Sequence, residues 1–498
     1  GRIAEIYVDY NSVVKKGPML NPKNNAAILR LAVLTNVAKS FLENNLSDIE
    51  NIPVNLVPDD SKPMRGTLEK DRNAVKQLCL AALGFTPCNV AADKSLSDSA
   101  KDFLARTELE KATVSVLPGV CDACKSTHYE VTSACHGCYA RPCAVNCPKK
   151  TIIVAKKAVI LQDNCIKCGL CAGNCPYNAI NKALVPCEDA CPVGAISKDE
   201  NGVEHIDNDK CISCGKCIVS CPFGAIAHNS QLLDVLKALK NPQQKTIAML
   251  APAVIGQFGN DLGKVITAFK KLGFDEVVEV AQGADITTTQ EAAEFVERMH
   301  EGAKFMTTSC CPAWMQAMEK HLPELKEYVS TSGSPMYYIA EVMKKEFPEY
   351  KTVFVGPCMA KRLEAERNPN VDYVLIFEEL QAAFDAAQIN PATLEADKFA
   401  VESSAQGRRF PISGGVAGAV QFVVGDKAEY KPIKIDGLTK DSCKLLKRFA
   451  TKAPEDANMV EVMCCEGGCI AGPGAVIPAK RGTVLVENYV KTSKDIEC

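Results

Sequence analysis

Residues 459–474 read MVEVMCCEGGCIAGPG, in which an apolar, β-branched run ends directly in a loop of cysteines and glycines. The run predicts a buried β-strand. Two other expected strands end in the same way, at TTSCCPAW (307–314) and VGPCMAK (355–361). Ligands bind beyond the carboxyl ends of strands in α/β sheets. Three cysteine loops at three such ends can therefore converge on one site.

The chain from about residue 246 onward alternates apolar, β-branched runs with helical patterns. Helical periodicity occupies 261–274 and 287–302. This alternation favours an α/β domain of mostly parallel sheets covered on both faces, which we place at 246–498. The expected strands are 246–252, 276–281, 304–309, 352–357, 373–377 and 459–463.

Six cysteines in the three loops are candidate metal ligands. A lone buried cysteine is usually a small apolar core residue. Six of them at three strand ends, flanked by Pro and Gly, instead favour a buried [4Fe–4S] cluster held by four thiolates. The candidates are Cys310, Cys311, Cys358, Cys464, Cys465 and Cys469.

Composition places the chain among soluble globular proteins. Its 498 residues carry a net charge of -3, which gives no indication of a nucleic-acid or membrane-surface partner. No apolar run is long enough to span a bilayer, and GRIAEIYVDY (1–10) alternates like a strand and lacks a signal-peptide core. We therefore expect a cytoplasmic protein. Its 26 cysteines have metal-ligand spacing, which disfavours disulfides.

Residues 121–230 hold 16 cysteines and an internal repeat of Cys-Pro segments. CIKCGLCAGNCP (165–176) and CISCGKCIVSCP (211–222) match the C-x2-C-x2-C-x3-C-P pattern of bacterial [4Fe–4S] ferredoxins. A cubane needs four thiolates, and in two-cluster ferredoxins the fourth cysteine of each run serves the other cluster. Sixteen cysteines therefore predict four clusters in a ferredoxin-like α+β region.

One grouping uses all sixteen cysteines and inserts one two-cluster unit, at about 133–182, inside another. A rival grouping joins the 165–175 and 211–221 runs directly, and the CDAC pair at 121–124 could instead hold zinc. The four sets of the first grouping are Cys135, Cys138, Cys143 and Cys175; Cys165, Cys168, Cys171 and Cys147; Cys121, Cys124, Cys187 and Cys221; and Cys211, Cys214, Cys217 and Cys191.

Residues 1–120 show no catalytic constellation, and we interpret them as an accessory domain with a structural or docking role. The stretch 24–46 has the apolar spacing of an amphipathic helix.

Together, TSCCPAW, PC-x2-K and C-x3-C followed by glycines resemble the three signature motifs of [FeFe]-hydrogenases, over roughly 246–490. The upstream ferredoxin region is similar to that family's modular architecture. The resemblance implies a catalytic domain of two lobes with the cofactor between them. That cofactor is the H-cluster, a [4Fe–4S] cubane joined by a cysteine sulfur to a diiron unit with CO, cyanide and azadithiolate ligands.

The resemblance also implies roles for single residues. The cubane ligands are Cys311, Cys358, Cys465 and Cys469, with Cys469 as the bridge to the diiron unit. Cys310 matches the proton-donating cysteine and Lys361 the lysine that hydrogen-bonds a cyanide ligand. Further cofactor contacts are expected at Pro252, Ser334, Pro357 and Met463.

A proton relay is implied along one helical face. Glu291, Glu294 and Arg298 lie three and four residues apart, and Ser330 matches the family's serine. Without the resemblance, a solvated charged face would be the better interpretation.

Three departures indicate a divergent subgroup. Gly356 stands where well-known members have methionine, Cys464 where they have alanine, and Met336 begins a segment where others have glutamines. We expect the glycine to open space beside the diiron unit. The glycines around Cys469 are expected to let the backbone approach the cofactor.

The sequence therefore predicts an anaerobic, ferredoxin-linked hydrogenase that needs a soluble electron carrier and dedicated maturation proteins. A hydrogen sensor, a cluster-assembly protein and a simple polyferredoxin are the competing interpretations. No sensory or DNA-binding module supports the first, and Cys310 and Lys361 are unnecessary in the second. The third leaves the α/β domain unexplained.

Overall fold

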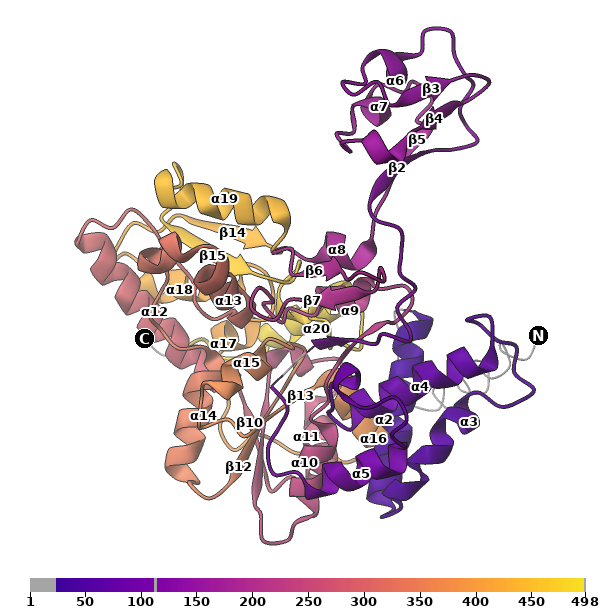
Figure 1. Ribbon diagram of the computed structural model, residues 1–498. Coiled ribbons are helices and arrows are strands. Elements are labelled where there is room, and N and C mark those ends of the chain that lie inside the picture. The colour runs from indigo at the N-terminus through magenta and orange to yellow at the C-terminus, as the bar shows by residue number, and fades with distance from the viewer. Residues whose placement is uncertain (1–23, 112–113, 497–498) are drawn as a thin grey trace.

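Two parallel β-sheets form the framework of the C-terminal half of the chain in the computed structural model (Figure 1). The structure describes residues 24–111 and 114–496, so the strand expected at 1–10 lies outside the described residues. The larger sheet has the order β10-β9-β12-β13, with every neighbouring pair parallel. Its strands are Glu276–Glu279, Thr246–Leu250, Lys351–Gly356 and Tyr373–Ile376, in that order.

Both faces of the larger sheet are covered by helices, as the continuous apolar runs of its strands require. Ile247 and Met249 of β9 pack against α14 (Pro335–Glu346) on one face. The alternate residues Ala248 and Leu250 belong to a second core, which includes α11 (Leu262–Leu272) and α16 (Phe377–Ala386). The expected parallel α/β arrangement is confirmed for this part of the chain.

The smaller sheet has the order β11-β15-β14, and its central strand β15 (Met459–Met463) is wholly buried. The flanking strands are β11 (Met306–Thr307) and β14 (Pro432–Asp436), of which β14 was not anticipated. The helices that pack around this sheet are α12 (Ala281–His300), α13 (Pro312–His321), α18 (Gly415–Val424) and α19 (Lys440–Thr451).

The α12 helix begins earlier than its sequence pattern indicates. The strand expected at 276–281 ends at Glu279, and α12 starts two residues later at Ala281, well before the expected 287. The helix expected at 261–274 is found as α11, capped by Asp261 and ended by Gly273 in the left-handed conformation.

Four N-terminal helices share a hydrophobic core with the larger sheet's helices, and α2 packs directly on α16. They are α2 (Asn25–Leu42), α3 (Ile52–Leu56), α4 (Leu68–Ala82) and α5 (Leu96–Ala105). The helix expected at 24–46 is therefore found as α2. Its apolar side chains share one hydrophobic core with α16, and Arg30 pairs with the buried Glu378 at 2.9 Å.

Between these helices and the α/β part lie the short elements of the cysteine-rich region. Strand β1 (Val114–Val116) pairs with β8 (Ile226–His228), and β6 (Ile196–Lys198) pairs with β7 (Glu204–Ile206). Helices α8 (Pro186–Ala190) and α9 (Lys216–Ser220) pack on each other. The backbone oxygen of Asn229 accepts a hydrogen bond of 2.6 Å from Arg362, which ties this region to the α/β part.

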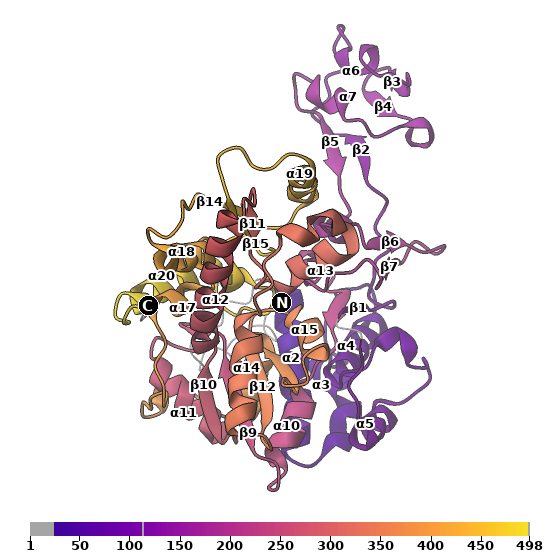
Figure 2. The same ribbon diagram turned by 90° about the vertical axis from the view of Figure 1, so that its left-hand side faces the viewer.

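One segment projects away from the rest of the molecule in both views (Figures 1 and 2). We call residues 128–183 the projecting unit. Strands β2 (His128–Val131) and β5 (Ile180–Ala183) pair at its base. The unit also contains β3 (Ile152–Val154), β4 (Ala158–Ile160), α6 (Pro142–Val145) and α7 (Leu170–Gly173).

The remaining helices lie within the α/β part and complete its surface. They are α10 (Leu232–Lys240), α15 (Lys361–Glu366), α17 (Ala405–Arg409) and α20 (Ala479–Val490). Among the residues that the structure describes, no helix has both the length and the apolar character needed to cross a membrane.

Candidate active site

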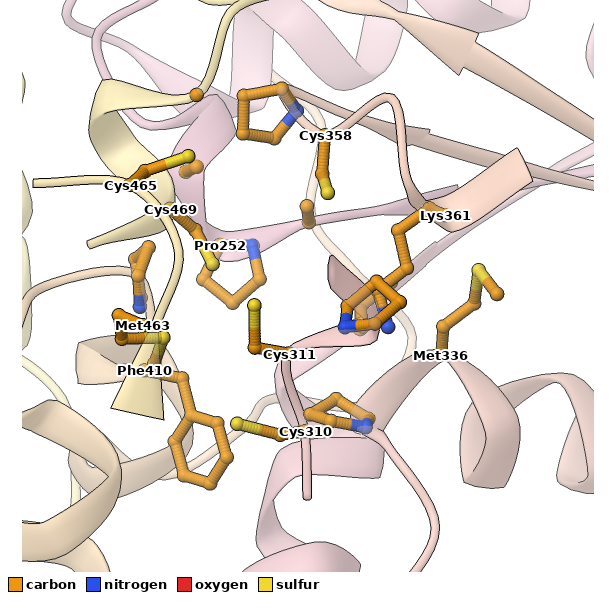
Figure 3. Close-up of a pocket in the computed structure, with 18 of the residues that line it drawn as sticks. Pro252, Cys310, Cys311, Met336, Cys358, Lys361, Phe410, Met463, Cys465 and Cys469 are labelled. Carbon is orange, nitrogen blue, oxygen red and sulfur yellow. The ribbon is translucent and has the colours of Figure 1, made fainter. Parts of the chain in front are cut away.

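A cavity lies where strand ends of the two sheets meet, and Figure 3 shows its lining. Cys358 follows β12, Cys311 precedes α13, and Cys465 and Cys469 follow β15. The three cysteine loops expected to converge therefore do so. Pro252, Pro357 and Met463 also line the cavity.

The sulfurs of Cys311, Cys358, Cys465 and Cys469 surround the centre of the cavity (Figure 3). Burial raises the pKa of all four thiols, that of Cys358 to about 12. Four buried thiolates therefore need positive charge beside them, which iron ions supply. The donor set fits a [4Fe–4S] cubane.

Cys310 lies beside this set, with its sulfur near Phe410 and Met463 (Figure 3). Burial, followed by the negative charge of Glu291, raises its pKa well above the usual value. Cys310 therefore holds its proton at neutral pH. Phe410 was not recognised in the sequence, because no motif distinguishes it from an ordinary core aromatic.

Lys361 is a buried ammonium at the opposite side of the cavity (Figure 3). Its Nζ donates to Ser334 Oγ at 2.9 Å and to Glu364 Oε2 at 2.6 Å. Burial would lower the pKa of Lys361, but the charge and hydrogen bond of Glu364, together with the charges of Cys358 and Cys310, raise it. Ser334 lies outside the cavity lining and accepts from Tyr337 N at the start of α14.

Two glutamates on α12 have opposite protonation states. Burial, followed by the charge of Glu294, raises the pKa of Glu291 to about 8. Neither carboxyl oxygen of Glu291 has a well-formed hydrogen bond within the described residues. Burial would also raise the pKa of Glu294, but hydrogen bonds from Ser330 and Thr331 and the charge of Arg298 lower it. A neutral acid therefore lies next to an ionised one, which suits proton transfer.

The expected relay residues form one connected group. Ser330 Oγ donates to Glu294 Oε2 at 2.6 Å, and Arg298 donates to Glu294 Oε1 at 2.6 Å. The charges of Glu291 and Cys310 are close enough to interact. The group extends from the partly exposed Arg298 to the cavity wall.

The glycines of the 464–474 loop bring it close to other protein segments. Gly468 has a φ of +91°, and a Cβ there would lie 2.5 Å from Pro411 O. A Cβ at Gly472 would lie 2.7 Å from Pro357 O. These glycines therefore let neighbouring loops close around the cavity, which Gly472 itself lines. The expectation that they also let the backbone approach a cofactor stays a prediction.

The space beside Gly356 is filled. A Cβ there would meet the ring of Phe354, which itself lines the cavity. The expectation that this glycine opens the cavity is therefore wrong, because an aromatic ring two residues earlier occupies the room. Met336 also lines the cavity (Figure 3).

Cys214, expected as an accessory-cluster ligand, also lines this cavity. A hydrogen bond from the Cys464 thiol lowers the pKa of Cys214. Cys464, a candidate ligand that is not among the four implied by the resemblance, therefore lies between the cysteine-rich region and Cys465. Sequence spacing could not reveal this contact, because it joins residues 250 positions apart.

The projecting unit contains two cysteine-lined hollows. The structure brings together the first two sets of the inserted-unit grouping rather than those of its rival. One hollow is lined by Cys135, Cys138, Cys143 and Cys175. The other is lined by Cys147, Cys165, Cys168 and Cys171.

The other eight cysteines of the region also lie in two neighbourhoods. Cys124 interacts electrostatically with Cys121 and Cys221, and Cys187 with Cys221. Cys217 interacts with Cys211, Cys214 and Cys191, and also with Cys187 of the first neighbourhood. Among the described residues, no group of three or more His, Cys, Asp or Glu side chains is placed to hold a single metal ion.

Comparison with known protein families gives three matches. Residues 244–473 match the family model "Iron only hydrogenase large subunit, C-terminal domain". Residues 158–181 match a 4Fe–4S binding domain, and residues 183–232 match an Fe–S cluster-binding domain named LdpA. The prediction of iron–sulfur binding is confirmed by these matches.

Three curated proteins illustrate the relationship. Iron hydrogenase 1 of Clostridium pasteurianum is 31% identical over 64% of this chain, which spans 65% of that protein. The periplasmic [Fe] hydrogenase large subunit of Nitratidesulfovibrio vulgaris is 31% identical over 48% of this chain and 71% of that protein. Cytosolic iron-sulfur assembly component 3 of Mus musculus is 25% identical over 45% of this chain and 59% of that protein.

Proposed function

Because this chain belongs to the iron-only hydrogenase family, we propose that it catalyses the reversible reaction 2 H⁺ + 2 e⁻ ⇌ H₂. One observation carries the proposal: the cavity combines four thiols with a protonated cysteine, Cys310, and an ammonium, Lys361. A cubane alone needs only the four thiols. The other two residues supply a proton and a positive charge to something beside it.

The residues of the cavity fit an H-cluster. Cys311, Cys358, Cys465 and Cys469 would hold the cubane, with Cys469 shared with the diiron unit. When bound, the H-cluster supplies the redox centre at which two protons and two electrons combine. The buried ammonium of Lys361 would offset the negative charge of cyanide ligands through charge-assisted hydrogen bonds. Pro252, Pro357 and Met463 exclude water from the site.

Protons reach the cavity through α12 and the loop that follows β11. Glu294 is ionised and accepts a proton from the solvent side, where Arg298 holds its carboxylate in place. Ser330 lies between Glu294 and Glu291, and Glu291 is protonated below about pH 8. Cys310 then donates its proton into the cavity, and the relay restores it.

The sixteen cysteines of the cysteine-rich region would hold four accessory [4Fe–4S] clusters, which would carry electrons to the cavity. Cys214 lines the cavity and interacts electrostatically with Cys217, so it would connect the last of these clusters to the site. We further propose that a soluble ferredoxin is the electron partner, that dedicated proteins mature the diiron unit, and that the protein works in an anaerobic cytoplasm. In this proposal the N-terminal helices support the α/β part, with which they share a core.

A cluster-assembly role is the competing function, and the similarity to cytosolic iron-sulfur assembly component 3 favours it. Such a role does not require Cys310 or Lys361 in the cavity. Their presence is why we prefer hydrogenase activity. A hydrogen sensor would share the whole cavity and differ in turnover rate.

Infrared spectroscopy tests the proposal. The protein is produced with hydrogenase maturation proteins and measured under nitrogen and then under hydrogen. We expect iron-bound CO and cyanide bands that shift under hydrogen, together with viologen-linked hydrogen evolution. Fully iron-loaded protein without these bands would establish the assembly role instead. Shifting bands with negligible turnover would indicate a sensor.

A further inference from the structure

The projecting unit holds the most accessible cysteine of the sixteen in the cysteine-rich region. Cys168 is exposed, whereas the other fifteen are buried or intermediate. Cys168 lines the hollow that also contains Cys147, Cys165 and Cys171. Electron transfer slows steeply with distance, so a cluster with an exposed ligand is the natural point of entry.

The projecting unit is strongly basic within an acidic chain. It contains seven Lys and Arg residues but only Glu130 and Asp163 as acids, which gives it a charge of +5 in a chain of -3. All seven basic side chains are exposed, and none forms an ion pair within the described residues. They are Arg141, Lys149, Lys150, Lys156, Lys157, Lys167 and Lys182.

Apolar side chains are exposed among these cations. Ile166 and Leu170 border the hollow of Cys168 and are 54% and 48% exposed. Lys149 borders the same hollow, and Lys167 lies between Ile166 and Cys168 in sequence. We call Lys149, Ile166, Lys167 and Leu170 the basic rim. Apolar contacts surrounded by unpaired charge are typical of a transient docking surface.

We propose that the basic rim docks a small acidic electron carrier and that electrons enter through the cluster held by Cys147, Cys165, Cys168 and Cys171. This inference rests on the proposed function and assigns the partner's binding face. The occupant is an acidic protein rather than a second copy of this chain, because two copies would bring two surfaces of charge +5 together.

Each docking event transfers one electron. The carrier's reduced centre loses one electron and the cluster at the basic rim gains it, with no bond formed or broken. Two events supply the two electrons that reduce two protons to one H₂. The complex must therefore dissociate quickly, which suits steering by exposed charges.

Charge reversal tests the docking face. In Lys149→Glu/Lys167→Glu, two rim cations become anions. The matched control, Lys304→Glu/Lys480→Glu, makes the same change in net charge at exposed sites on the main body. The probe is an acidic [4Fe–4S] ferredoxin, used reduced for hydrogen evolution and oxidised for calorimetric binding. Methyl viologen serves as a small donor that needs no docking face.

At low ionic strength we expect the KM for ferredoxin to rise about tenfold in the rim variant and less than about twofold in the control. The Kd should rise in parallel, and the viologen-linked rate should stay unchanged. The neutral variant Lys149→Gln/Lys167→Gln removes the two charges without reversing them, and its KM for ferredoxin should be intermediate. The iron content of each variant, measured alongside, should equal that of the wild type.

If the KM for ferredoxin rises equally in both charge-reversal variants, or rises in neither, the basic rim is not the docking face. Self-association of the wild-type chain that is lost in the rim variant would identify a second copy as the occupant instead. If no protein evolves hydrogen with viologen, the proposed function fails, but ferredoxin binding still decides whether the rim is a docking site.

Discussion

A Cβ atom at Gly356 would lie 2.7 Å from the ring of Phe354. The two residues therefore share one space at the cavity wall, where Phe354 supplies the bulk and Gly356 leaves room for it. The missing methionine of the second motif does not enlarge this site.

Substitution of Gly356 tests that relationship. Gly356→Met alone should overpack the wall, at a cost of about 1–3 kcal/mol in folding free energy. Adding Phe354→Ala should recover much of the loss, because the new side chain then has room. The thermal midpoints of both single variants and of the double variant measure the loss of stability and its recovery. Losses that simply add would show that the two positions are independent. The double variant should also change the ratio of hydrogen uptake to evolution.

Cys310→Ala should reduce turnover by at least about a hundredfold while the infrared bands and iron content stay unchanged. The reason is that Cys310 lies beside the four ligand thiols and holds a proton. Cys443→Ala is the control, since Cys443 lies outside the cavity lining. Normal turnover in the Cys310 variant would remove this residue from the proton path.

The buried acid Glu291 should make stability depend on pH. Its pKa is about 8 in the folded protein and about 4.3 in an unfolded chain, so the folded state holds more protons between these values. Its contribution to stability is fully present below pH 4 and is lost as the pH rises through 8. The thermal midpoint of Glu291→Gln should therefore fall less between pH 6 and pH 9 than that of the wild type. Parallel curves would mean that Glu291 titrates normally.

The grouping of accessory cysteines predicts which substitutions affect the same cluster. Cys135→Ala and Cys175→Ala should perturb one common paramagnetic signal, because both residues line one hollow. Cys165→Ala should perturb a different one, since it lines the other hollow. Electron paramagnetic resonance of reduced protein makes the comparison. A shared signal for Cys165 and Cys175 would favour the rival grouping.

Sequence patterns were most informative where local chemistry sets the structure. The strands that precede Cys358 and Cys464 are continuous apolar runs, and both were found as β12 and β15. Strand β14 was missed because it is a half-exposed edge strand that reads PIKID, with a proline and a lysine among its few apolar residues. The early start of α12 was hidden because its first residues read AQGAD, which include the weak helix former Gly283 and lack a run of apolar residues at helical spacing.

Contacts between segments that are distant in sequence could not be predicted from local sequence patterns. Nothing in the spacing places Cys214 in the wall of the active-site cavity, or the Phe354 ring against Gly356. The packing of α2 on α16 likewise depends on complementary surfaces that are more than 300 residues apart in sequence. Such contacts arise only when the whole chain is folded.

The paired strands at the base of the projecting unit have an evolutionary consequence. His128 lies opposite Ala183, so the chain leaves the unit beside the point where it entered. An insertion whose ends meet interrupts no other element, and a short turn could close the gap. The two cysteine neighbourhoods outside the projecting unit would be kept whether the unit is present or absent. Gain or loss of this unit would therefore leave the elements around the cysteine-lined cavity uninterrupted.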